Sequence, residues 1–410
     1  MSKMYKTKFE RLFDIPSTKY DLLFLFLSAL IGFIGLSSSQ PEHSRLIFLI
    51  PVFWCMASKR YIAFLTVFLY KSFASRGLIP GAAIFFSECH TLFHAICLWL
   101  LMNVGYSFPF LVFWSKNPSR KALCFLAAFL VTYVLPPISI IGAINPVIIG
   151  AASLLPPGSG FWGIGIALLL IMYCCFSRKI ASVSLCVIFF SAFSPLAFAP
   201  APADFYPINT SFGRLASGSI DFSSDFERAR MVFDDLRARR IRDLEQRFIV
   251  LPETIAGRMN ETGIRLWKME LDAIMRDDQV VFWGGEIPTS LTKYDNVLFM
   301  YDGNELSYSA QRIPVPYSMY RPFTNTGANL HYFADGILPL PDGRSAAILI
   351  CYEGFLTWPI LLSMLHNPDV IIAPSNFWWC RDTSIPISHE RYVSLLGRLF
   401  GIPVVFAVNK

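Results

Sequence analysis

Polar side chains with catalytic potential follow three short apolar runs in the second half of the chain. Glu253 follows FIVLP, Cys351 follows AAILI, and Ser375 and Asn376 follow VIIAP. A free thiol is only a few per cent thiolate near neutral pH, so a nucleophilic cysteine needs a general base such as a carboxylate. A cation or fixed donor is also needed, to hold the oxyanion that forms when a thiolate attacks a carbonyl group. Together these residue types indicate covalent acyl chemistry at Cys351.

The sequence around Cys351 predicts a strand, a tight turn and a helix. The turn signal at 341–343, Pro-Asp-Gly, precedes a short run rich in isoleucine, which is typical of a buried strand. The apolar run 355–365 predicts a helix, so the thiol would be held rigidly at the strand end. The alternative is a structural cysteine in a core strand, and the segment taken alone favours that alternative.

Composition divides the 410-residue chain into two parts. Residues 21–199 are mostly apolar, whereas 205–410 have an ordinary mixture of charged residues, Gly and Pro. The first part predicts membrane spans and the second a globular domain. The formal net charge of +6 comes partly from Lys and Arg at the edges of apolar runs. Such charges set orientation in a membrane and do not indicate nucleic-acid binding. Of the cysteines outside the apolar part, Cys351 and Cys380 could form a disulfide if this part is exported.

Apolar runs in the first part predict seven membrane spans, because about 20 apolar residues cross the hydrocarbon. A basic leader in the cytoplasm and an odd number of spans would put the second part outside the cytoplasm. The predicted organisation is a transmembrane helical domain at 1–199, a linker at 200–224 and a globular domain at 225–410. The predicted spans are 20–36, 46–57, 61–72, 90–114, 122–143, 160–176 and 180–199.

Strands and helices alternate in the second part, which predicts an α/β domain with its site along one sheet edge. Glu286 follows a predicted strand and two glycines, and we expect it to have a surface or loop role. Predicted helices are 226–246, 263–275 and 389–400; predicted strands are 248–251, 280–283, 370–373 and 404–408, with a hairpin at 296–301 and 306–308.

The order of the motifs resembles the nitrilase superfamily of carbon–nitrogen hydrolases, and within it the apolipoprotein N-acyltransferases. The resemblance is carried by LPET at 251–254, ICYE at 350–353 and SNFWW at 375–379. It implies a polytopic membrane domain followed by an α-β-β-α sandwich. It also implies that Cys351 is the nucleophile and Glu253 the general base, with supporting roles for Tyr352, Glu353, Ser375, Asn376 and Trp379.

The chain departs from this family where the family carries a catalytic lysine. The corresponding segment, 311–322, begins with Gln311 and has Met319 where the family has a second glutamate. Arg312 is the nearest cation, although its planar fork differs in shape from an ammonium group. Arg312 or Gln311 would therefore take the lysine position. The chain ends at Lys410, and family members normally continue into further strands and a last membrane span.

The resemblance implies an inner-membrane acyltransferase that needs no metal or cofactor. Its acyl donor would be a phospholipid and its acceptor an amine or a lipoprotein. The amino terminus would lie in the cytoplasm and the second domain in the periplasm. The architecture is also similar to TraB-type conjugal transfer proteins, which implies a role in plasmid conjugation, with the conjugation apparatus as a candidate partner. The alternatives are a catalytically impaired accessory or scaffold protein of conjugation, and a small-amide hydrolase.

Overall fold

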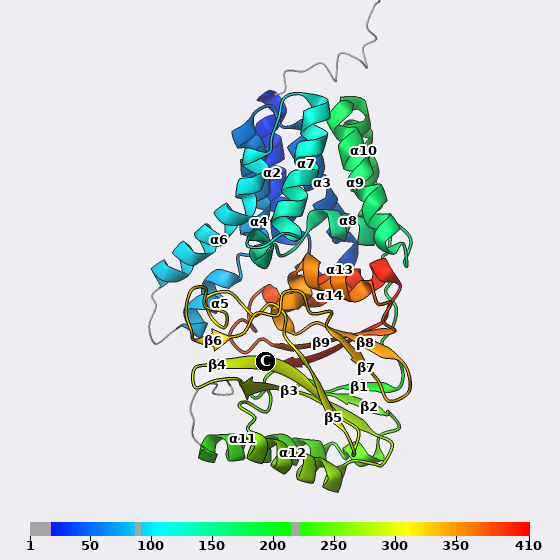
Figure 1. Ribbon diagram of the computed structural model, residues 1–410. Helices are drawn as coiled ribbons and strands as arrows, with labels where there is room; N and C mark the ends of the chain where they lie inside the picture. Colours follow the sequence, from blue (N-terminus) through cyan, green and yellow to red (C-terminus); the bar gives the residue numbers. More distant parts are fainter. Residues whose placement is uncertain (1–17, 87–91, 215–221) are drawn as a thin grey trace, which may run out of the picture. The chain divides into compact units, whose positions relative to one another are not determined.

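The computed structural model describes residues 18–86, 92–214 and 222–410. These residues form two compact units, each described by itself below (Figure 1). The helical unit combines Met1–Ala197 with Thr383–Phe400, and the sheet unit combines Phe198–Asp382 with Gly401–Lys410. The sheet unit thus differs from the domain predicted at 225–410, because the segment Thr383–Phe400 groups with the helices.

Polar contacts explain why the last helix, α14 (Ile385–Phe400), belongs to the helical unit. The Arg398 guanidinium donates to the Leu155 carbonyl at 2.7 Å, and the buried Tyr392 hydroxyl accepts the Asn145 N–H at 3.4 Å. Hydropathy alone does not reveal such contacts between segments far apart in the sequence. The other α-helices of this unit are α2 (Thr18–Ile34), α3 (Leu49–Met56), α4 (Arg60–Ala74), α5 (Leu78–Phe85), α6 (Leu92–Val112), α7 (Pro118–Tyr133), α8 (Pro146–Leu154), α9 (Gly160–Phe176) and α10 (Arg178–Ser191).

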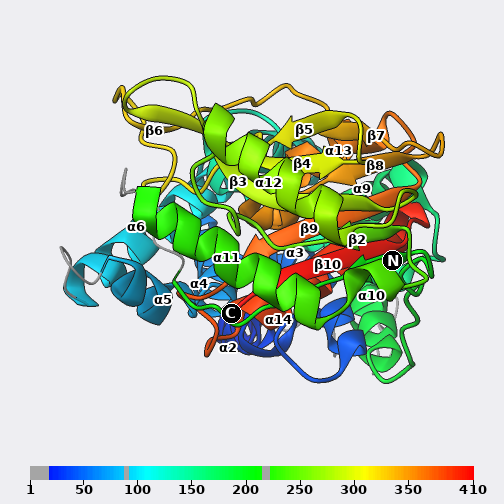
Figure 2. The ribbon, with the colours of Figure 1, turned by 90° about the horizontal axis from the view of Figure 1, so that it is seen from below.

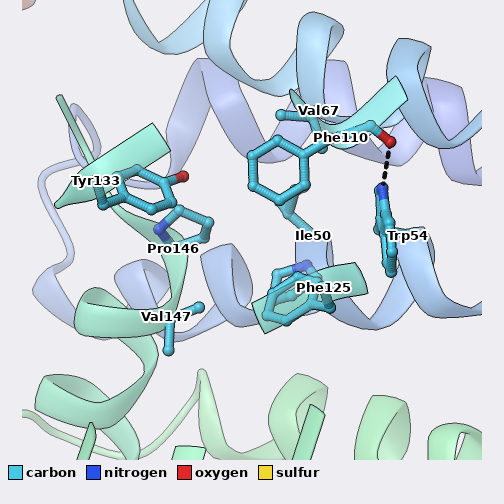
Figure 3. A pocket seen from close by; sticks show the side chains of 9 residues that line it. Ile50, Trp54, Val67, Phe110, Phe125, Tyr133, Pro146 and Val147 are labelled. Carbon is cyan, nitrogen blue, oxygen red and sulfur yellow. Dashed lines mark hydrogen bonds between the residues drawn. The ribbon is translucent and has the colours of Figure 1, made fainter. Parts of the chain in front are cut away.

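Aromatic side chains from several helices meet in the core of the helical unit (Figure 3). The ring of Trp54 on α3 lies 5.3 Å from that of Phe125 and 6.2 Å from that of Phe110, between ring centroids. The Trp54 indole N–H donates to the Phe110 carbonyl at 3.1 Å, so this buried polar group is satisfied. With Ile50, Val67 and other apolar residues these rings line a small cavity. Its lining is typical of a packed core.

Among the described residues, one helix, Leu92–Val112, is long and apolar enough to cross a membrane. Helices α4 and α5 pass the same test as a pair, with a bend of 54° between them. The seven spans predicted from hydropathy are therefore not confirmed. The run 46–57 shows the physical reason, because most of it forms the 8-residue helix α3, which is almost entirely buried in its own unit. An apolar run this short fits a core helix better than a span.

The sheet unit contains a six-stranded sheet in the order β1-β2-β3-β4-β5, with β6 paired to β4 (Figure 1). Strands β1 to β3 are parallel, and β3, β4 and β5 run antiparallel. Residues 205–207 of the predicted linker form β1 and pair with β2, so the linker prediction does not hold for this segment. The bounds are β1 (Phe205–Pro207), β2 (Phe248–Val250), β3 (Val280–Pro288), β4 (Lys293–Tyr301), β5 (Leu306–Ala310) and β6 (Gly327–Ala328).

A second sheet of four strands has the order β10-β9-β8-β7. Strands β8, β9 and β10 are parallel, and β7 pairs with β8 in the antiparallel direction. Helix α13 (Thr357–Met364) follows the turn after β8 and contacts that strand. The bounds are β7 (Ile337–Pro339), β8 (Ser345–Ile348), β9 (Val370–Asn376) and β10 (Val404–Asn409).

Helices α11 (Phe222–Ala238) and α12 (Glu261–Ile274) lie side by side against one face of the six-stranded sheet (Figures 1 and 2). The core between them is aromatic: Trp267 of α12 stacks on Trp283 of β3, which stacks on Phe299 of β4. The other face of this sheet meets the second sheet, since β1 contacts β10 and β5 contacts β7. Two stacked sheets with helices outside them give an α/β architecture, in agreement with the predicted class.

Candidate active site

Cys351 follows β8 after two residues and takes the first position of the 3-10 turn Cys351–Phe355, which leads into α13. Its φ of 49° is in the left-handed region, which residues other than glycine rarely adopt. Such a conformation costs roughly 1–3 kcal/mol and is concentrated at functional turns. The predicted strand, tight turn and helix around this cysteine are confirmed.

The side chains of Cys351 and Glu253 are hydrogen-bonded to each other, and the backbone amide of Asn376 bonds both. Both side chains are buried, with 7% of Cys351 and 4% of Glu253 exposed. The ends of β2, β8 and β9 therefore meet at one place. Of the residues predicted to carry chemistry, the structure brings the candidate nucleophile and the candidate base into contact.

Burial raises the pKa of Glu253 from 4.5 to about 7, although hydrogen bonds from Cys351 and Asn296 oppose the rise. Burial also raises the pKa of the Cys351 thiol, and the charge of Glu253 adds to that rise. At neutral pH the thiol therefore keeps its proton until Glu253 accepts it. A carboxyl group with a pKa near the working pH is well matched to this role of general base.

Close backbone packing holds Glu253 in place. A Cβ atom on Gly284 of β3 would lie 2.3 Å from the Thr254 nitrogen and 2.5 Å from the Glu253 Cα. The Gly284 N–H donates to the Pro252 carbonyl at 3.1 Å, which ties the loop after β2 to the sheet. Glycine at this position lets the backbone carrying the acid approach the sheet closely.

Two uncharged amides extend from Glu253 toward the turn that carries Cys351. Nδ2 of Asn296 on β4 donates to Oε1 of Glu253 at 2.8 Å and to Oε1 of Gln311 at 2.9 Å. Nε2 of Gln311 donates in turn to the carbonyl of Ile350 at 2.9 Å. All these side chains are buried, with 1% of Asn296 and 1% of Gln311 exposed. Gln311 thus joins the candidate acid to the residue before the candidate nucleophile.

Arg312 makes a different set of contacts from Gln311. Its Nε donates to Oε1 of Glu353 at 3.3 Å, and its Nη2 donates to the Ile348 carbonyl at 2.9 Å. Its Nη1 donates to the Pro359 carbonyl and the Ser363 hydroxyl, each at 2.8 Å. The guanidinium is fully buried and binds β8 and α13 together. Of the two residues expected at the lysine position, only Gln311 is hydrogen-bonded into the network of Glu253.

Glu353 holds the turn on which Cys351 lies. Its carboxylate accepts the N–H of Ile350 at 3.0 Å and that of Ile313 at 3.1 Å, as well as the backbone N–H of Arg312. Burial raises the pKa of Glu353, and the Arg312 guanidinium and these backbone groups oppose the rise. A buried acid with a cationic partner and several donors is typical of a structural support.

Glu286 is buried, contrary to the surface or loop role expected for it. It is 4% exposed, lies opposite Asn296 in the β3–β4 ladder, and has Arg258 Nε at 3.9 Å. Burial raises the pKa of Glu286 to about 7, and the charges of Arg258 and Arg228 oppose the rise. The sequence prediction ended the strand at Trp283, whereas β3 continues through the two glycines to Pro288 and carries Glu286 inward.

Comparison with curated proteins identifies the family. The conjugal transfer protein TraB of Agrobacterium fabrum is 31% identical to this chain, over 94% of the chain and 92% of that protein. The probable conjugal transfer protein TraB of Sinorhizobium fredii is 30% identical, over 88% of the chain and 90% of that protein. The chain belongs to the TraB family of conjugal transfer proteins. No family model matches it.

Solved structures similar to this TraB-family chain include amidases of the nitrilase superfamily from Nesterenkonia. One variant is 13% identical and covers 50% of this chain and 74% of its own, with a TM-score of 0.35. A second, with a covalent addition at its active-site cysteine, is 12% identical and covers 52% and 79%, with a TM-score of 0.38.

The remaining predicted residues of the TraB-family chain surround the contact between Cys351 and Glu253. Ser375 is fully buried on β9, and its Oγ has no hydrogen-bond partner among the described residues. The side chain of Asn376 accepts from Nδ2 of Asn409 at 2.9 Å, which fixes the end of β9 against β10. Sequence patterns do not point to Asn409, because its role depends on strand pairing.

Tyr352, Trp379 and Cys380 are the remaining residues that the sequence analysis considered. Tyr352 and Trp379 are half-buried, and burial raises the pKa of the Tyr352 hydroxyl. Cys380 is buried and is a free thiol, as is Cys351, so the disulfide considered as an alternative is not formed. Asn296 was not predicted as a site residue. Its signal in the sequence is a single amide at the start of an otherwise apolar strand.

Proposed function

We propose that this TraB-family chain is a membrane-associated acyltransferase acting in plasmid conjugation, with Cys351 as its nucleophile. The contact between the Cys351 thiol and the Glu253 carboxyl, both buried and both at strand ends, carries this proposal. The family membership supports the link with conjugation. The resemblance of the LPET and ICYE motifs to N-acyltransferases suggests a phospholipid as acyl donor and an amine as acceptor.

In the first half of the proposed reaction, Glu253 takes the thiol proton and the Cys351 sulfur attacks the carbonyl carbon of an acyl ester. The tetrahedral oxyanion collapses, the ester C–O bond breaks, and Glu253 returns its proton to the leaving alkoxide. In the second half, an amine attacks the thioester carbonyl and Glu253 accepts a proton from the amine. The tetrahedral intermediate collapses to the amide, the C–S bond breaks, and Glu253 returns the proton to the Cys351 thiolate. This scheme is a ping-pong acyl transfer through a covalent intermediate.

Exposed apolar stripes on the helical unit support a position in a membrane. On α9, the exposed residues Trp162, Ile166, Leu169 and Tyr173 recur at helical spacing, and 85% of Trp162 is accessible. Helix α10 has a similar row formed by Val183, Val187 and Phe190. Continuous apolar faces of this kind on a protein surface mark contact with a membrane or a partner. A phospholipid donor would be available at such a surface.

The test is intact-mass analysis of the purified full chain after incubation with a phospholipid carrying a labelled acyl chain. We expect one acyl adduct per chain, sensitive to hydroxylamine as a thioester is, and absent from Cys351→Ala. Cys380→Ala is the matched control, because that buried thiol lies in the same unit and should leave the adduct unchanged. A wild-type chain that forms no adduct, or an adduct that persists in Cys351→Ala, would contradict the proposal.

A second candidate is an accessory protein of the conjugation apparatus that keeps the site without turnover. Gln311 favours it, because an uncharged amide occupies the position where the resemblance implies a lysine. Removing one oxyanion donor typically slows a reaction by about 10² to 10³. Plasmid-transfer frequency separates the two candidates, since Cys351→Ala should reduce transfer if chemistry is required and leave it unchanged if the protein is a scaffold.

A further inference from the structure

The hydrogen bonds of Gln311 and Asn296 have one possible direction. The Ile350 carbonyl can only accept, so the group of Gln311 that meets it at 2.9 Å must be the NH2. The Gln311 oxygen then faces Asn296, whose NH2 must donate to it at 2.9 Å. The second N–H of Asn296 donates to the Glu253 carboxyl at 2.8 Å. The backbone thus sets the orientation of both amides.

One N–H of Gln311 is left over by this arrangement. Its NH2 has two hydrogens, and the Ile350 carbonyl is its only partner among the described residues. Gln311 is 1% exposed, and its amide bonds the carbonyl of the peptide group that joins Ile350 to Cys351. The buried amide nitrogen therefore keeps one hydrogen that can be donated to a further acceptor.

Two side-chain oxygens of the candidate site residues are unmet. Oδ1 of Asn296 and Oγ of Ser375 are buried and have no partner among the residues that the structure describes. Asn296 bonds Glu253 through its other side-chain atom, and Ser375 directly precedes the Asn376 amide that bonds both Cys351 and Glu253. Arg312 cannot replace Gln311 as the donor here, because its guanidinium is engaged with Glu353, β8 and α13.

We propose that the free N–H of Gln311 is the oxyanion donor of this site, and that Asn296 is the positioning residue that orients both Gln311 and Glu253. The site then works without a cation on its oxyanion side. This inference rests on the proposed function, because an oxyanion forms only if Cys351 attacks a carbonyl group. A neutral amide can serve, since side-chain amides are established donors to oxyanions in acyl-transfer sites.

The test compares two reactions of the same thiol in the full chain. Iodoacetamide alkylates Cys351 by displacing iodide and forms no oxyanion, so its rate reports the thiol and Glu253 alone. A p-nitrophenyl ester of a fatty acid acylates Cys351 through an oxyanion and releases a coloured product. Gln311→Met removes the donor while keeping a similar volume. We expect it to slow the acylation burst by about 10² to 10³ and to change the alkylation rate by less than about threefold.

Two further variants, one at Asn296 and one that places a lysine at position 311, extend the test. Asn296→Ala should slow both reactions and move the pH midpoint of alkylation upward, because Glu253 loses a hydrogen bond that lowers its pKa while Cys351 and Glu286 remain beside it. A purely structural defect would change rate or stability without moving that midpoint. Gln311→Lys, which keeps a donor, should retain acylation within about tenfold of wild type, a smaller loss than that of a missing donor.

The outcomes separate the inference from the proposed function. If wild type is acylated and Gln311→Met is acylated equally fast, the donor role is wrong and the acyl-transfer proposal stands. If the wild-type chain is alkylated by iodoacetamide but never acylated, the donor role and the acyl-transfer proposal both fail. If Gln311→Met loses both reactions to the same extent, Gln311 supports the site and is not its oxyanion donor.

Discussion

Replacing Glu253 by glutamine should make the protein more stable at alkaline pH. Burial holds the pKa of Glu253 at about 7 against an ordinary value of 4.5. Below pH 4.5 the group is protonated in both the folded and the unfolded chain, so it has no effect on stability. As pH rises toward 7, the unfolded chain releases the proton and the folded chain keeps it, which lowers stability. Above pH 7 both forms are ionised and the loss is complete.

The size of this loss follows from the difference between the two pKa values. At about 1.36 kcal/mol per pKa unit, ionised Glu253 lowers stability by about 3 kcal/mol at pH 8 and by less than about 1 kcal/mol at pH 5. Glu253 is almost fully buried, so solvent screening reduces this figure little. For a unit of 150–250 residues, about 3 kcal/mol corresponds to a melting-temperature change of roughly 6–12 °C.

The assay is thermal unfolding of the full chain in detergent at pH 5 and at pH 8. We expect Glu253→Gln to melt roughly 6–12 °C above wild type at pH 8 and close to wild type at pH 5. Glu261→Gln is the control, since that side chain is 92% exposed and should change neither value. A variant that gains nothing at pH 8, or gains equally at both pH values, would show that Glu253 is not a strained acid.

Three further perturbations test the supports of the site. Glu353→Gln should destabilise the chain by about 3–5 kcal/mol, because it leaves the Arg312 guanidinium buried without its charge partner. Unfolding in denaturant measures this loss, and a value below about 1 kcal/mol would refute the prediction. Gly284→Ala should slow iodoacetamide alkylation of Cys351 at least tenfold, because its Cβ would displace the Glu253 backbone, and an unchanged rate would refute the packing argument. In wild type, the alkylation rate should rise with a midpoint near pH 7 as Glu253 ionises, and Glu253→Gln should abolish that step, as a pH profile would show.

Sequence patterns predicted the local structure around Cys351 well. The turn at 341–343 and the isoleucine-rich run placed Cys351 after a strand, and the structure has β8 ending at Ile348 before the turn. Strand ends were predictable because a change from apolar to polar residues marks them. That information is local. The stacking of the sheet that carries β2 on the sheet that carries β8 and β9, which brings Glu253 to Cys351, could only be inferred from the motif resemblance.

Glycines and short apolar helices account for the main differences between the predicted and the observed structure. Gly284 and Gly285 looked like the end of a strand, but β3 continues through them because glycine is needed where the Glu253 backbone approaches. The helical unit shows the converse problem. Buried helices such as α3 are as apolar as a membrane span, so hydropathy alone does not distinguish a span from a core helix. Length and burial distinguish the two cases, and burial is known only from the fold.

The neutral amide of Gln311 and the raised pKa of Glu253 are linked through the hydrogen bonds of Asn296. An ammonium group hydrogen-bonded into this network would favour the ionised form of Glu253 and lower its pKa. Gln311 is neutral, so burial dominates and the pKa of Glu253 stays at about 7. In the proposed acyl transfer, the acid would then be a stronger base once ionised, and an uncharged donor would stabilise the oxyanion less than a cation. Such a site should favour acyl donors with good leaving groups, and comparing thioester, ester and amide donors on wild type and Gln311→Lys would test this. A lysine that speeds amide and ester donors more than thioesters would support the argument, and an equal effect on all three would refute it.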